Sequence, residues 1–115
     1  MTFNYKKHKD ELLFLPLGGS GEIGMNLNFY HLDGKWIALD CGAGFAEDFL
    51  PGVDMIVPNI ESVHEFKKDL IGIVLTHAHE DHVGAVPYLW EELGFPPVYA
   101  TPFTAAFLRA KLAEF

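Results

Sequence analysis

The chain contains little cysteine, few basic residues and no long apolar run, and each shortage excludes a class of protein. Its 115 residues include one cysteine, Cys41, so an internal disulfide is excluded and a reducing compartment is expected. The start, MTFNYKKHKD, lacks the apolar core of a secretory signal. No apolar run approaches the roughly 20 residues that span a bilayer. We therefore expect a cytoplasmic protein without a membrane segment.

Basic residues are scarce, since 8 Lys and Arg stand against 16 Asp and Glu, and the formal net charge is −8. Phosphate groups are bound by basic side chains, so this acidic chain is not expected to hold nucleic acid on its own surface. Half of the residues are hydrophobic and 14% are aromatic, which is enough for a packed core. The length predicts one domain or part of one.

Hydrophobic periodicity predicts an α/β arrangement of the order β-β-β-α-β-α-β-α. We expect strands at 11–18, 70–76 and 97–101, a hairpin across 25–42, a long loop at 41–58, and helices at 59–69, 84–94 and 102–115. Asp33-Gly34 predicts the hairpin turn, because a type I′ turn needs positive φ at both central residues. The continuous apolar run 70–76 predicts a strand buried on both faces. Phe103 and Phe107 are expected on the inward face of the last helix.

The stretch LPLGGSGEIGMN, residues 15–26, has three glycines at the spacing of a dinucleotide-binding fingerprint, Gly19, Gly21 and Gly24. An acidic residue, Asp40, follows at about the distance that this fingerprint requires. The fingerprint also needs a helix after its third glycine, with the phosphate at the helix N-terminus. Because a hairpin is expected there, we interpret the glycines as tight turns between strands and not as a nucleotide cradle.

Three of the six histidines lie within THAHEDH, residues 76–82, directly after the predicted strand 70–76. In extended chain, His77 and His79 point to one side and can chelate one ion. Asp81 and His82 come where the chain turns into the next helix, so they can serve a neighbouring ion. Imidazole and carboxylate ligands suit zinc, with manganese or iron as substitutes. The alternative, a polar loop with exposed histidines, explains neither the clustering nor the position after a buried strand.

Asp40 ends another apolar strand, KWIALD, and would face the histidine loop if that strand lies beside 70–76. There its carboxylate would orient a ligand histidine by a hydrogen bond. The alternative is an aspartate that only begins the turn before Gly42. Cys41 is interpreted as a packing residue. The three histidines without a spacing partner are interpreted as ordinary surface or turn residues: His8, His31 and His64.

The residues THAHEDHVGAVPYL resemble the His-x-His-x-Asp-His signature of the metallo-β-lactamase superfamily, and Asp40 stands where that superfamily has its first-motif aspartate. LPLGGSGEIGMN and LPGVDMIVPN resemble the ribonuclease J branch of the superfamily, in nearly the whole chain from about residue 13 to about residue 110. The resemblance implies an α/β fold that forms the N-terminal half of an αββα sandwich. The resemblance also implies that the glycine stretch forms a turn near the site, as is typical of the family.

The resemblance further implies a two-metal hydrolase that cuts RNA by endonucleolytic and 5′-to-3′ exonucleolytic action. The cofactors would be two zinc ions, with manganese possible in their place. Carried over to this sequence, His77 and His79 hold one ion, and Asp81 and His82 hold the other. Asp81 also takes a catalytic part by handling a proton, and Asp40 supports a ligand histidine.

The family has more metal ligands downstream, an inserted β-CASP domain and a C-terminal domain, none of which falls within residues 1–115. The chain is therefore expected to be the N-terminal part of the metallo-β-lactamase domain, inactive alone and metal-free or weakly metal-binding. An uncovered sheet would also favour a homo-oligomer.

Two other functions stay open at this point. One is a small-molecule hydrolase of the same superfamily, acting on an ester, thioester or lactam. The other is a metal-binding or interaction module without enzyme activity. The glycine stretch, Glu80 and the segment 86–89 favour the nuclease over the small-molecule hydrolase. The Asp81-His82 pair argues against a purely structural zinc site, which has no need of a second metal position.

Overall fold

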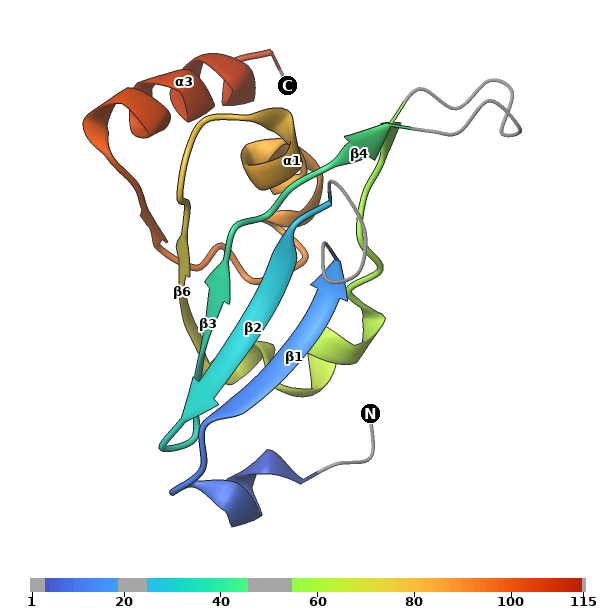
Figure 1. Ribbon diagram of the computed structural model, residues 1–115, viewed down its shortest axis with the longest axis vertical. Helices are drawn as coiled ribbons and strands as arrows, with labels where there is room; N and C mark the ends of the chain where they lie inside the picture. The colour runs from blue at the N-terminus through green and yellow to red at the C-terminus, as the bar shows by residue number, and fades with distance from the viewer. Residues whose placement is uncertain (1–3, 19–24, 46–54, 115) are drawn as a thin grey trace.

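The computed structural model describes residues 4–18, 25–45 and 55–114 as a mixed β-sheet with short helices (Figure 1). The sheet has five strands in the order β1-β2-β3-β6-β7, and β4 pairs with β5 in a separate two-stranded ribbon. The strands are β1 (Leu13–Gly18), β2 (Leu27–Leu32), β3 (Lys35–Leu39), β4 (Gly44–Phe45), β5 (Met55–Ile56), β6 (Leu70–Val74) and β7 (Val98–Tyr99). The helices are η1 (Tyr5–His8), η2 (Glu61–Glu65), η3 (Lys67–Asp69), α1 (Glu80–Val83), α2 (Val86–Leu89) and α3 (Pro102–Leu112), of which η1 to η3 are 3₁₀ helices.

The hairpin predicted at Asp33-Gly34 is confirmed. Strands β2 and β3 pair antiparallel with Leu32 opposite Lys35, and both turn residues have positive φ, 53° for Asp33 and 77° for Gly34. The glycines at 19–24 lie outside the described residues. Met25 and Asn26 lead directly into β2, at the position where a dinucleotide fingerprint needs a helix.

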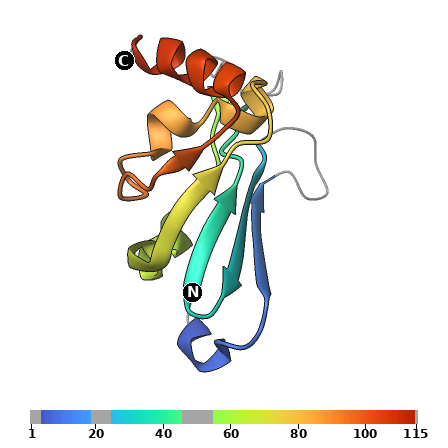
Figure 2. The same ribbon diagram turned by 90° about the vertical axis from the view of Figure 1, so that its left-hand side faces the viewer.

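Strand β1 pairs antiparallel with β2, but two other pairs in the sheet are parallel, and this parallel pairing determines where a site can form. Strand β3 pairs with β6, and β6 pairs with β7, both in parallel. The carboxyl ends of β3 and β6 therefore meet at one edge of the sheet, and α1 and α3 lie beyond that edge (Figures 1 and 2). Sites of open α/β sheets form at such an edge.

One face of the sheet carries the hydrophobic core. Phe29 of β2 and Trp36 of β3 are fully buried there, and the ring of Phe66 stacks on Trp36 with the ring centroids 4.2 Å apart. Val63 of η2 and Phe66, which lies between η2 and η3, contribute to this face, in the stretch for which an ordinary helix was predicted. The apolar side chains of this stretch face the core, as expected, but they lie on 3₁₀ turns and not on an α-helix.

Within the described residues, the opposite face of the sheet is apolar and exposes several large side chains, although the Tyr99 ring lies against Gly72. Phe14, Tyr30, Ile37 and Gly72 form one row across four strands, since each is the register partner of the next. Phe14 is 52% exposed and Ile71 is 51% exposed. The expectation that 70–76 is buried on both faces is therefore wrong, because Ile71 of β6 is half exposed.

The helices near the C-terminus also differ from the prediction. The region 84–94 contains α2 and a run of turns, and Gly94 ends it with a φ of 89°. In α3, Leu108 is buried, but Phe103 is 75% exposed and Phe107 is 39% exposed, so the inward orientation predicted for both rings is wrong. No helix within the described ranges is long and apolar enough to cross a membrane.

His31 is a buried structural residue and not the surface or turn residue expected. Its Nε2 accepts a hydrogen bond from the backbone N–H of Gly34 at 3.0 Å, so its Nδ1 carries the proton that points to the carbonyl of Glu11 at 3.2 Å. The side chain thus ties the hairpin turn to the segment before β1.

The exposed apolar face of the sheet leads us to predict that the purified 115-residue chain self-associates. The sedimentation coefficient is expected to rise with concentration. Replacing Ile37, near the middle of this face, by lysine is expected to weaken association, whereas Phe103→Lys on α3 leaves it unchanged. A wild-type chain that stays a folded monomer across the concentration series would contradict the prediction.

A partly buried hydrogen bond from Tyr5 to the Asp69 carboxylate ties η1 to the end of η3. Burial and this bond raise the pKa of Tyr5 to about 12, and the same bond holds the pKa of Asp69 below its usual range. Tyr5→Phe is expected to lower the free energy of unfolding at pH 7 by about 1.5 kcal/mol. Exposed Tyr99→Phe serves as the control and is expected to change it by less than about 0.5 kcal/mol.

The pH dependence of this difference has a definite sign. The Tyr5 contribution is complete below pH 10 and is lost as the pH rises towards about 12. The Asp69 contribution is lost as the pH falls through its lowered pKa. Urea unfolding at several pH values should therefore give the largest difference between wild type and Tyr5→Phe in the neutral range. An equal difference at pH 7 and above pH 12 would contradict this assignment.

Candidate metal centre

The site begins where the parallel strands β3 and β6 end. The backbone N–H of Asp40 donates to the carbonyl of Val74 at 2.8 Å, which continues the pairing by one residue beyond β3. Asp40 has a φ of 65°, in the left-handed region that aspartate tolerates better than most residues. This bend turns the chain out of the sheet and leaves the Asp40 carboxylate beside Thr76, which lies just beyond β6.

The Asp40 carboxylate is almost fully buried and joins the two segments by hydrogen bonds. It accepts the backbone N–H of Thr76 at 2.8 Å and lies 2.9 and 3.0 Å from the Thr76 hydroxyl. Its second oxygen is 2.7 Å from Nδ1 of His82. A carboxylate only accepts, so His82 donates from Nδ1, and in the neutral ring the lone pair is then on Nε2, which lies 3.5 Å from Nδ2 of Asn26. Asp40 thus contacts a histidine of the THAHEDH segment, as expected from its position after an apolar strand.

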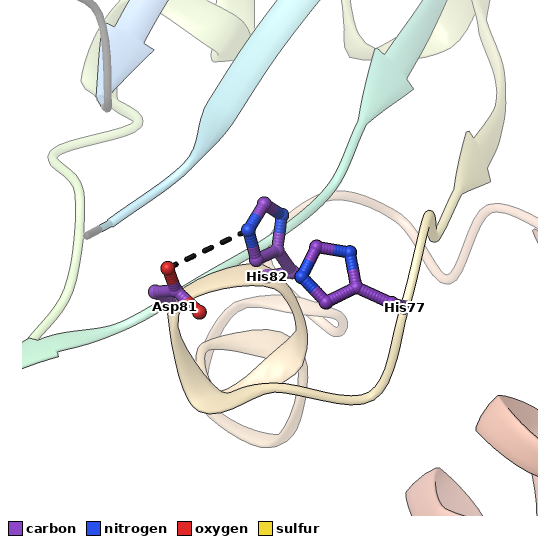
Figure 3. A group of neighbouring side chains, drawn as sticks. All are labelled: His77, Asp81 and His82. Atoms are coloured by element: carbon purple, nitrogen blue, oxygen red, sulfur yellow. Dashed lines mark ion pairs between the residues drawn. The ribbon is translucent and has the colours of Figure 1, made fainter. Parts of the chain in front are cut away.

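His77, Asp81 and His82 converge at this edge. One ligand atom of each lies within 4.8 Å of the others, and Figure 3 shows the three side chains side by side at the start of α1. Nε2 of His82 is 3.5 Å from a carboxylate oxygen of Asp81, and the rings of His77 and His82 have centroids 3.8 Å apart. Two imidazoles and a carboxylate are a donor set that fits a divalent first-row cation.

His79 lies beside His77, as the spacing predicted, but it is not part of the group of three ligand atoms. Its ring meets that of His77 edge-on with the centroids 4.7 Å apart. The structure therefore brings together His77, Asp81 and His82, and puts His79 next to His77 on the exposed side.

The backbone around Asp81 is held by two residues that sequence reasoning did not single out, Asn26 and Gly42. The carbonyl of Asp81 accepts hydrogen bonds from the backbone N–H and the side-chain Nδ2 of Asn26, both at 2.9 Å. A Cβ at Gly42 would lie 1.7 Å from that same carbonyl oxygen. The N–H of Cys41 donates to the carbonyl of His82 at 2.8 Å. Asn26 is the last residue of the glycine stretch 15–26, and this stretch is the sequence signal that could have pointed to its contact with Asp81.

Cys41 is a packing residue, as expected. Its side chain is fully buried, and burial together with the nearby Asp40 carboxylate raises the pKa of its thiol to about 12. At neutral pH the thiol is therefore protonated and contributes no thiolate ligand to the site.

With this fold and this cluster of ligands, the chain belongs to the metallo-beta-lactamase superfamily, whose family model matches residues 26–114. Within the superfamily, its curated relatives include several ribonucleases J. Ribonuclease J of Sinorhizobium meliloti is 52% identical over 108 residues, which are 90% of this chain and 19% of that protein. The Helicobacter pylori protein is 42% identical over 106 residues (92% of this chain, 15% of that protein), and the Thermus thermophilus protein is 37% identical over 111 residues (93% and 19%).

These relatives confirm the predicted resemblance to the ribonuclease J branch. The chain spans about a fifth or less of their length. Among solved structures, human tRNase Z, short form, matches with a TM-score of 0.54 and 18% identity over 90% of this chain and 39% of that one. This likeness, together with the family model, confirms the α/β fold of a partial metallo-β-lactamase domain.

Gly42→Ala is predicted to disrupt the site, since the added methyl group would overlap the backbone carbonyl of Asp81. We expect the free energy of unfolding to fall by more than about 3 kcal/mol. Gly94→Ala is the control, because Gly94 has positive φ but open space around it and should cost about 1 kcal/mol. Denaturant unfolding measures both values, and equal losses for the two variants would contradict the close contact at Gly42.

Proposed function

We propose that this chain is the N-terminal, metal-binding part of a ribonuclease that hydrolyses RNA phosphodiester bonds in the cytoplasm. The observation that carries the proposal is the convergence of His77, Asp81 and His82, with the buried Asp40 carboxylate against His82. The ribonuclease J relatives, at 37–52% identity, support RNA as the substrate. The rest of the metallo-β-lactamase domain, a β-CASP domain and a C-terminal domain would lie in the remainder of a longer protein.

The proposed cofactors are two zinc ions, with manganese as a substitute. His77 and His79 would hold one ion, and Asp81 and His82 the other. Two protein ligands for each ion are fewer than the three of a typical catalytic zinc, so the further ligands would come from outside this chain. When bound, such a pair lowers the pKa of water and stabilises the charge that develops on a phosphate.

The residues of this chain would prepare the site before the substrate arrives. Asp40 holds Nδ1 of His82, and so directs Nε2 toward Asp81. Asn26 fixes the carbonyl of Asp81 and thereby the start of α1. The Asp81 side chain is 40% exposed, which leaves its carboxylate accessible to a substrate, and we assign it the catalytic proton-handling part.

RNA would be held mainly by the remainder of the longer protein. The chain has a net charge of −8, and neutralising a phosphate backbone requires basic side chains. The 115-residue chain alone is therefore expected to bind metal weakly and to leave RNA uncut.

A chimera tests the function directly, in which this chain replaces the matching segment of the S. meliloti ribonuclease J. We expect metal-dependent cleavage of 5′-labelled RNA that EDTA abolishes and zinc restores. His77→Ala and His82→Ala should each lower bound zinc and the cleavage rate by more than about 100-fold. His64→Ala, which removes an exposed imidazole on η2, is the matched control and should have no effect.

Two outcomes would overturn the proposal. One is full RNA cleavage by the His77→Ala chimera. The other is a zinc-loaded chimera that leaves RNA intact and hydrolyses an ester, thioester or lactam, which would identify a small-molecule hydrolase. RNA cleavage by the 115-residue chain alone would contradict the expected need for further ligands.

A further inference from the structure

Thr76 lies at the centre of the hydrogen bonds at the strand edge. The spacing of the metal ligands does not by itself predict a role for its side chain. Its hydroxyl oxygen is 2.9 and 3.0 Å from the two carboxylate oxygens of Asp40 and 3.0 Å from Nδ1 of His77. Nδ1 of His82 is farther away, at 3.4 Å. The hydroxyl is therefore placed between the buried carboxylate and the imidazole of His77.

The donor and acceptor properties of these groups allow one arrangement. A hydroxyl has a single hydrogen to donate, and the Asp40 carboxylate has none. The Thr76 hydrogen must therefore point to Asp40. The contact between the hydroxyl oxygen and His77 is then a hydrogen bond only if Nδ1 of His77 carries the proton. In that tautomer Nε2 of His77 has a free lone pair, which is the form that ligates a metal.

We propose that Thr76 is a positioning residue whose hydroxyl links the Asp40 carboxylate to His77 by hydrogen bonds. Through this relay, one buried carboxylate fixes the tautomers of two imidazoles. His82 is held directly by Asp40 at 2.7 Å, and His77 is held through the Thr76 hydroxyl. Each neutral ring then has the lone pair on Nε2, the nitrogen that can ligate a metal. The inference rests on the proposed metal site, but it concerns the tautomers of the chain's own side chains before any metal is bound.

The backbone of Thr76 makes the relay testable by substitution. Its N–H donates to Asp40 at 2.8 Å, and this bond persists whatever the side chain is. Thr76→Val keeps the shape of the side chain and removes only the hydroxyl. Thr76→Ser keeps the hydroxyl. Thr104→Val is a control, because the Thr104 hydroxyl contacts that of Thr101 at the start of α3 and not the site.

The decisive measurement is the nitrogen-15 spectrum of the histidine side chains in the metal-free 115-residue chain at about pH 8.5, where free imidazole is neutral. We expect the protons of His77 and His82 on Nδ1 in wild type. In Thr76→Val, His77 should lose its preference for the proton on Nδ1, whereas His82 should keep it. In Thr76→Ser, the proton of His77 should again be on Nδ1. A wild-type His77 with its proton on Nε2 overturns the proposal even if Thr76→Val does not fold. An unchanged His77 tautomer in a folded Thr76→Val chain also overturns it.

Metal affinity gives a second readout that does not depend on RNA cleavage. In the chimera, competition with a chelator should show zinc binding weakened about 10- to 100-fold by Thr76→Val, and near wild type in Thr76→Ser and Thr104→Val. Equal zinc affinity in Thr76→Val and wild type contradicts the relay. A chimera with this Thr76 dependence that cuts no RNA would keep the relay and reject the ribonuclease, so the two failures are distinguishable.

Discussion

The hydrogen bonding of one buried carboxylate, that of Asp40, organises the strand edge on which the rest of the site depends. A carboxylate removed from water is costly unless donors surround it. Asp40 meets this requirement with donors from Thr76, just beyond β6, and from His82, in α1. The same hydrogen bonds that stabilise the Asp40 carboxylate therefore also fix the positions of the groups that donate to it. Removing any of these donors leaves the Asp40 carboxylate as a poorly paired buried charge, which is costly.

A second set of contacts fixes the backbone under the ligands. Asn26, at the entry to β2, holds the carbonyl of Asp81, while Gly42 leaves room for that carbonyl to approach. Side chains could not pack so closely, and for this reason the contact uses a glycine and main-chain donors. The glycine-containing stretch before β2 thus serves the site through Asn26, its last residue. Side-chain hydrogen bonds orient the ligands, and backbone hydrogen bonds from two other segments hold the main chain beneath them.

Local patterns in the sequence predicted the parts of the structure that depend on local chemistry. The Asp33-Gly34 turn, the apolar strand before the histidines and the cluster of ligands in 77–82 each follow from residue type and spacing. The contacts of Asn26 and Thr76 could not be predicted in this way, since they join residues 55 and 36 positions apart. Spacing also predicted His79 beside His77, where its ring lies, but not that His77 would be grouped with Asp81 and His82 from the start of α1.

Burial was the less predictable property, for a related reason. A continuous apolar strand such as 70–74 is typical of a sheet covered on both sides, and Phe103 and Phe107 fit the apolar stripe of a packed helix. Both arguments assume that every apolar face has a partner within the chain. Ile71 and Phe103 are instead exposed in this chain, so the sequence pattern records a hydrophobic face without saying what covers it.

The parallel pairing of β3 with β6 has a consequence for the order of assembly. It brings Trp36 opposite Leu70, across a connection that cannot be a tight turn. Closing so long a loop costs entropy before any contact is gained, so this step is slower than closing the β2–β3 hairpin. Asp40 and the histidines meet only after that closure. A nascent chain would therefore complete its hairpin first, and the ligand cluster would be among the last features to mature.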